Sequence, residues 1–106
     1  MIVSLTQGAA TIVEPEDFSR LHVATVLLPE EVNAALRKTG IGTTSTDGRI
    51  LLDIEALRSA AEAASASPQW SQGWSKMIDY AQTRQWVSPD GCGVWAHVEY
   101  LPKSAE

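Results

Sequence analysis

The sequence predicts a small α+β domain with two layers, in which about three helices cover a small, mainly antiparallel sheet. Stretches whose apolar residues alternate, as they do in strands, lie toward both ends of the chain. Between them lie stretches whose apolar residues recur every three or four positions, as they do in helices. The chain has 106 residues, the length of one domain, so we expect residues 1–106 to form a single unit.

Three segments are expected to form the sheet. Residues 18–28 are apolar on both faces in their second half, which is typical of a central strand. Residues 41–45 and 49–52 flank Thr46-Asp47-Gly48, and an Asp-Gly pair between β-branched stretches predicts a hairpin. Residues 94–101 alternate again and are expected to form the last strand.

The two ends of the chain carry weaker patterns. Residues 1–14 hold only short apolar runs, so we expect a loosely packed arm or an edge strand there. Pro102 stops the last strand, and residues 102–106 are expected to form a polar tail.

Local signals predict two helices between the first strand and residue 65. The first is expected over residues 29–39, because Pro29 suits the first helical position and Gly40 suits a left-handed end. Asp53 suits the N-cap of the second helix, which we expect over residues 54 to about 65.

A third helix is expected over residues 68–84, with Ser67 as its N-cap and Pro68 as its first residue. Gly73 inside this helix costs roughly 1 kcal/mol relative to Ala, which indicates close packing at that position. The apolar residues of the helix form one stripe that we expect to be buried: Trp70, Trp74, Met77, Ile78 and Ala81.

A winged-helix-like arrangement is the alternative fold. Helix 54–65 and helix 68–84 are followed by a strand–turn–strand pattern over residues 86–100. This is the order of a winged-helix domain, in which a recognition helix is followed by a strand, a wing and a second strand. The charge argues against a DNA reader, because residues 68–101 carry two basic and three acidic side chains.

Composition excludes several functional classes. The net charge of −5 is spread evenly and leaves no basic stripe for a nucleic-acid backbone. A single cysteine fits a reducing compartment, and no apolar run approaches the ~18 residues that a membrane span needs. We therefore expect a cytoplasmic protein without nucleic-acid or membrane partners.

Five side chains are candidates for acid–base chemistry. His97 and Glu99 are two residues apart on an expected strand, so they share a face, and a carboxylate can raise the basicity of an imidazole. A solvated strand face is the simpler interpretation of this pair. If the domain is an enzyme, its pocket is expected between helix 68–84 and the sheet. The candidate residues are then His97, Glu99, Asp79, Tyr80 and His22.

Metal and cofactor motifs are absent from the sequence. No HxH, HxxxH or CxxC spacing occurs, so we expect neither a metal site nor a cofactor. Cys92 lies between Gly91 and Gly93, where its thiol could reach a ligand, although an inert thiol is the simpler interpretation.

The tryptophans suggest an interaction surface. Four Trp in one small domain are more than a core usually needs, and Trp concentrates at protein interfaces. The sequence therefore favours a non-catalytic protein-interaction or accessory module that self-associates. Two alternatives stay open: a small-molecule-binding domain or cofactor-free acid–base enzyme, and a winged-helix-type regulator. The candidate binding residues are Trp70, Trp74, Trp86, Trp95 and Cys92.

Overall fold

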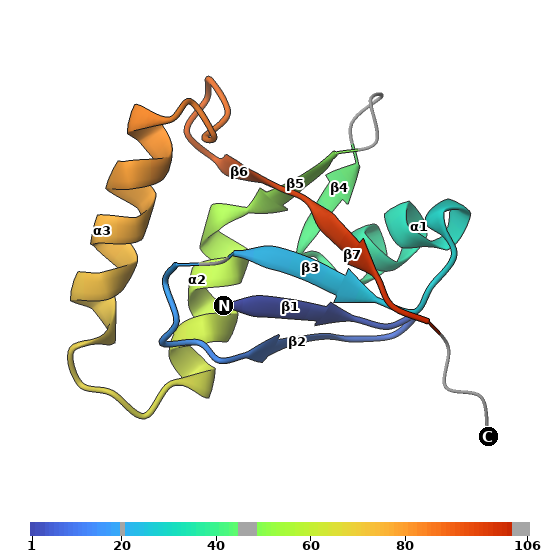
Figure 1. Ribbon diagram of the computed structural model, residues 1–106, viewed down its shortest axis with the longest axis horizontal. Helices are drawn as coiled ribbons and strands as arrows, with labels where there is room; N and C mark the ends of the chain where they lie inside the picture. Colours follow the sequence, from blue (N-terminus) through green and yellow to red (C-terminus); the bar gives the residue numbers. More distant parts are fainter. Residues whose placement is uncertain (20, 45–48, 103–106) are drawn as a thin grey trace.

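The computed structural model describes residues 1–19, 21–44 and 49–102. Its seven strands form two sheets, with strand orders β2-β1-β3-β7 and β4-β5-β6 (Figure 1). We expected one sheet. The strands are Ile2–Leu5 (β1), Ala10–Val13 (β2), His22–Thr25 (β3), Gly42–Thr44 (β4), Ile50–Asp53 (β5), Gly93–Ala96 (β6) and Val98–Tyr100 (β7).

Three helices complete the described fold: Pro29–Thr39 (α1), Ile54–Ala64 (α2) and Trp70–Thr83 (α3). The α+β class that the sequence predicts is confirmed, and three of the five strand pairings are antiparallel. None of the described helices combines the length and the apolar character that crossing a membrane requires.

The last strand connects the two sheets. We expected one strand over residues 94–101, but it is interrupted at His97 into β6 and β7. β6 pairs with β5, whereas the carbonyl of His97 accepts a hydrogen bond from the Val23 amide of β3 at 3.0 Å. One extended segment therefore bonds to β5 through one edge and to β3 through the other, and so joins the two sheets. The regular alternation of its side chains does not reveal this change of partner.

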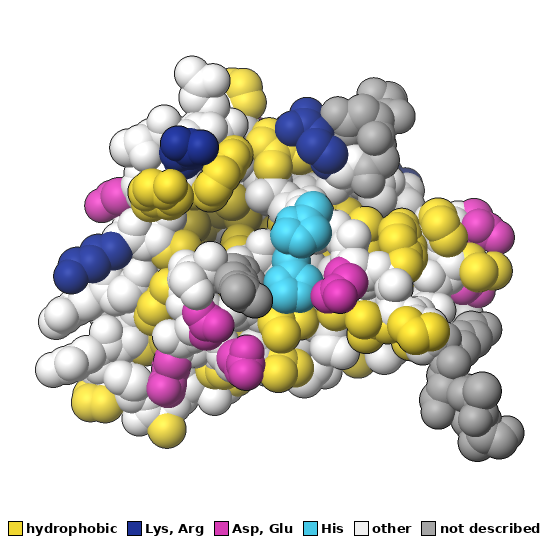
Figure 2. All heavy atoms as spheres, in the orientation of Figure 1, with side chains coloured by type: hydrophobic (Ala, Val, Ile, Leu, Met, Phe, Trp, Pro, Cys, Tyr) yellow, Lys and Arg dark blue, Asp and Glu magenta, His cyan; other side chains and the backbone are white. Residues whose placement is uncertain are grey.

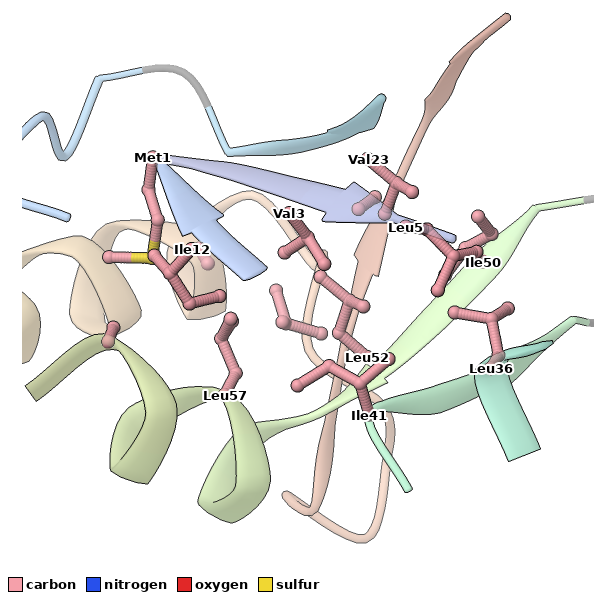
Figure 3. Close-up of a cluster of buried hydrophobic side chains, with 14 of the residues drawn as sticks. Met1, Val3, Leu5, Ile12, Val23, Leu36, Ile41, Ile50, Leu52 and Leu57 are labelled. Atoms are coloured by element: carbon pink, nitrogen blue, oxygen red, sulfur yellow. The ribbon is translucent and has the colours of Figure 1, made fainter. Parts of the chain in front are cut away.

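The first residues belong to the core. Met1, Val3 and Leu5 are fully buried, and β1 lies between β2 and β3. Their side chains point toward Ile12, α2 and the second sheet (Figure 3). The expectation of a loosely packed arm is wrong for β1, because every second residue of this short strand packs against the helix layer. β2 is an edge strand of the larger sheet.

The strand expected over residues 18–28 is shorter. β3 does take a central place between β1 and β7, but it holds only His22–Thr25. Phe18 lies before it and packs against Trp70, with ring centroids 6.0 Å apart. Val26 and Leu28 are exposed, so the apolar faces of this segment are not buried throughout.

Helices α1 and α2 agree with their local signals. Pro29 starts α1, and Gly40 ends it in the left-handed region with φ of 77°. The Asp53 carboxylate caps α2 by accepting a hydrogen bond from the Ala56 amide at 2.9 Å. β4 and β5 pair as the predicted hairpin, whereas its turn at residues 46–48 lies outside the described residues.

Helix α3 begins two residues later than predicted. Residues 68 and 69 form a turn, and the carbonyl of Ser67 accepts a hydrogen bond from the Trp70 amide. A Cβ at Gly73 would lie 2.2 Å from a ring carbon of Phe18, so the expected close packing is present. Within the described residues, the predicted wing keeps a bridge between Val87 and Val94, and β6 also pairs with β5.

Candidate interaction surface

The four tryptophans divide into two buried and two accessible side chains. Trp70 and Trp74 are 3% and 6% exposed, and their rings stack with centroids 5.3 Å apart. The indole N–H of Trp70 donates to the carbonyl of Pro15 at 2.8 Å. These two residues belong to the core, as the helical spacing of the stripe indicates. Trp95 is half-buried, and Trp86 is 45% exposed.

The end of α3 fixes the position of Trp86. Gln85 adopts the left-handed region with φ of 61°, and the Trp86 amide donates to the carbonyl of Ala81 at 2.9 Å. Together with the bond from the Gln85 amide to the carbonyl of Gln82, this is a Schellman end. The backbone therefore holds Trp86 at the surface immediately after the helix.

Trp86 lies among two other exposed side chains of α3 and its end. The Tyr80 ring meets it edge-on with a centroid distance of 5.7 Å. The Arg84 guanidinium lies 5.6 Å from the centre of the Trp86 ring, within cation–π range. Tyr80 is itself 56% exposed, so this cluster offers aromatic area to a partner.

Trp95 forms a second arginine–tryptophan pair on the neighbouring strand. The Arg49 guanidinium lies 4.3 Å from the centre of the Trp95 ring. The amide of Trp95 donates to the carbonyl of Trp86 at 2.7 Å, so the two pairs lie on adjacent backbone segments. We call this set the Trp–Arg surface; it consists of Arg49, Tyr80, Arg84, Trp86 and Trp95.

A shallow groove borders the Trp–Arg surface between the end of α3 and β6. Trp95 and Val87 give it apolar walls, and Gln82 and Gln85 give it polar ones. The groove lies near the place where the sequence predicts a pocket, between helix 68–84 and the sheet. It is open to solvent and is lined by none of the five acid–base candidates.

His22, His97 and Glu99 come together on another part of the surface. The rings of His22 and His97 stack with centroids 5.4 Å apart, and Nε2 of His22 lies 3.4 Å from Oε1 of Glu99. Glu99 is largely exposed. The sequence places His97 and Glu99 on one face, but the contact with His22 depends on the pairing of β3 with β7.

Asp79 and Tyr80 do not join this histidine cluster. Both are exposed on α3, which stands apart from β7 (Figure 1). The five acid–base candidates therefore fall into at least two separate places. Within residues 1–19, 21–44 and 49–102, no three His, Cys, Asp or Glu side chains form a group that could hold a metal ion.

Cys92 lies in the turn that precedes β6. The Ser88 hydroxyl and the Cys92 amide both donate to Oδ1 of Asp90, at 2.5 and 3.0 Å. The hydrogen bond from Ser88, with that from Cys92, lowers the pKa of Asp90 below its ordinary value. Cys92 is exposed and borders a second open groove, lined also by Arg37, Asp53 and Gly93.

Comparisons with known proteins give no further information about function. No protein-family model, curated protein or solved structure matches the chain.

Two residues of the Trp–Arg surface, Arg49 and Arg84, are absent from the candidates that the sequence supplies. Arg84 lies two residues before Trp86, so closeness in the chain could have suggested it. Arg49 meets Trp95 only through the pairing of β5 with β6.

Proposed function

We propose that this chain is a non-catalytic protein-interaction module that associates with a second copy of itself through the Trp–Arg surface. The observation that carries the proposal is the position of Trp86, which is 45% exposed between Tyr80 and Arg84. Trp, Tyr and Arg are the residues that most often dominate the binding energy of protein interfaces.

The rigidity of this surface supports the proposal. Interface residues that are already ordered lose less conformational entropy on binding. Trp86 follows a Schellman helix end, and its carbonyl accepts a hydrogen bond from Trp95 of β6. The backbone that carries Trp86 and Trp95 is therefore ordered before a partner binds.

The histidine cluster gives weaker support for a catalytic function. His22, His97 and Glu99 could exchange a proton, but the two grooves described above are lined by other residues. A general base needs a bound substrate within hydrogen-bond reach.

Native mass spectrometry of wild type and two variants tests the proposed function. Trp86→Ala is expected to weaken self-association at least roughly tenfold, because it removes the central aromatic group. Tyr100→Ala is the matched control, since Tyr100 is 46% exposed on β7 and lies outside the Trp–Arg surface. Wild-type protein that stays monomeric, or equal losses in both variants, would contradict the proposal.

A small-molecule site in the groove beside Trp95 is the second candidate. It is favoured by the apolar Trp95 and Val87 walls between α3 and β6. A ligand of a few hundred daltons retained on a monomer in native mass spectrometry, and lost from Trp95→Ala, would support this candidate over self-association.

A further inference from the structure

Strand β2 is the outer strand on one side of the larger sheet, so one of its edges has no neighbouring strand among the described residues (Figure 1). The carbonyl of Ala9 accepts a hydrogen bond from the Thr6 amide at 2.9 Å, which continues the register of β1 and β2. Because bonded and non-bonded pairs alternate in an antiparallel ladder, Ala10 and Ile12 direct their N–H and C=O groups away from β1. Within residues 1–19, 21–44 and 49–102, no hydrogen bond reaches these outward groups.

The open edge of β2 lacks the charge by which proteins often protect the edge of a sheet. Residues 1–13 carry no charged side chain. The outer strand on the other side of this sheet, β7, carries the exposed Glu99, and β4 has only three residues. Figure 2, in the orientation of Figure 1, shows apolar and uncharged side chains along the border where β2 lies, and acidic ones toward the end where it stops. An uncharged edge of this kind favours pairing with another strand.

The side chains along this edge fit a second copy of the same strand. When two β2 strands pair antiparallel about a two-fold axis through Thr11, Ala10 of each copy lies opposite Ile12 of the other. Each of these pairs can exchange two hydrogen bonds through its outward backbone groups. The large side chain of Ile12 then lies beside a small one, and the exposed Thr11 side chains meet on the other face, where a Thr–Thr pair is favourable.

The charges at the end of the strand agree with the same register. Glu14 is the first charged residue after β2, and its backbone lies in the left-handed region with φ of 53°. In the two-fold pair, Glu14 follows Val13 at the end of the contact and lies opposite Gly8 of the other copy. No two like charges therefore face each other across the paired strands.

We propose that β2 pairs with β2 of a second copy, antiparallel and centred on Thr11, so that the two four-stranded sheets become one continuous sheet. This contact goes beyond the proposed function, because β2 lies outside the Trp–Arg surface and is separated from β7 by β1 and β3. A chain that uses both contacts can assemble beyond a dimer.

Disulfide cross-linking tests the register. Thr11→Cys and its matched control Val13→Cys are each combined with Cys92→Ser, because the Cys92 thiol is exposed. Both Thr11 and Val13 are exposed on the same face of β2. In the proposed pair, the two Cα atoms at position 11 lie about 4.5 Å apart, whereas those at position 13 lie about 14 Å apart. A disulfide requires Cα atoms within about 7 Å of each other.

After oxidation with diamide, Thr11→Cys is expected to give at least roughly tenfold more covalent dimer than Val13→Cys. No covalent dimer from Thr11→Cys, or equal amounts from both variants, would overturn the proposal. The cross-link is expected to persist when Trp86→Ala is added, because Trp86 is not part of this edge. Its persistence would support the β2 contact even if association through the Trp–Arg surface fails, and its loss would overturn β2 as an independent contact.

Hydrogen exchange of the wild type, followed by NMR at two protein concentrations, needs no variant. At the higher concentration, the outward amides of Ala10 and Ile12 are expected to exchange at least roughly threefold more slowly, because pairing covers them. The Thr11 amide faces β1 and should not change. Unchanged exchange at Ala10 and Ile12, or equal slowing at all three amides, would overturn the proposed pairing.

Discussion

The backbone amide of Trp95 donates a hydrogen bond to the carbonyl of Trp86, with nitrogen and oxygen 2.7 Å apart. This bond joins the segment after α3 to strand β6. Each of the two tryptophans also carries an arginine against its ring. This short stretch of non-helical chain thus places two arginine–tryptophan pairs beside each other, and Arg49 comes from a distant part of the sequence.

Replacing Trp74 tests the division of tryptophans between core and surface. Trp74→Ala is expected to lower the free energy of unfolding by about 3–5 kcal/mol, because it leaves a large cavity beside Trp70. Trp86→Ala is expected to cost less than about 1 kcal/mol, because that side chain is exposed. Urea denaturation followed by circular dichroism measures both. If Trp74→Ala lowers the free energy of unfolding by no more than about 0.5 kcal/mol, Trp74 is not part of the core.

Replacing Gln85 tests the Schellman end of α3. Gln85→Gly is expected to raise the free energy of unfolding by about 1 kcal/mol, because glycine adopts the left-handed region without strain. Gln82→Gly, three residues earlier and inside the helix, is expected to lower it by about 1 kcal/mol. Thermal unfolding compares the two variants. Destabilisation by both would show that Gln85 is not left-handed.

Adding a methyl group at Gly73 tests the contact between α3 and Phe18. Gly73→Ala is expected to destabilise the protein by about 1–3 kcal/mol, although alanine is the better helix former. The cause is the Phe18 ring, which lies where the new Cβ would be. In a Phe18→Ala background the same change is expected to be stabilising. Equal effects of Gly73→Ala in both backgrounds would show that Phe18 does not limit the site.

The titration of Asp90 tests the turn before β6. Hydrogen bonds from Ser88 and Cys92 lower the pKa of Asp90 below its ordinary value of 3.8. These bonds are therefore present at pH values above 3.8, and they are lost only as the pH falls through the lowered pKa. The Cys92 amide resonance is expected to shift in that acidic range. Ser88→Ala should move the midpoint upward, because the Ser88 bond is the larger cause. An unchanged midpoint in Ser88→Ala would contradict this assignment.

Features that depend on neighbouring residues in the chain could be predicted from the sequence. Pro29 and Gly40 locate α1, and Asp53 locates the start of α2, because caps act within a few residues. The stripe with Trp70 and Trp74 indicates the buried face of α3 for the same reason.

Features that depend on strand pairing could not be predicted. The interruption at His97 follows from its bond to Val23, and the contact of His22 with Glu99 follows from the pairing of β3 with β7. The pair of Arg49 and Trp95 likewise requires the register of β5 and β6. A single sequence carries side-chain periodicity but not the identity of each strand's partner.

Hydrogen exchange at two protein concentrations tests the central claim most directly. At the higher protein concentration, the amides around Tyr80 to Val87 are expected to gain protection, because association covers the Trp–Arg surface. Amides of β7 serve as the internal reference and should not change. Gained protection confined to β7, or no change at any amide, would contradict self-association through the Trp–Arg surface.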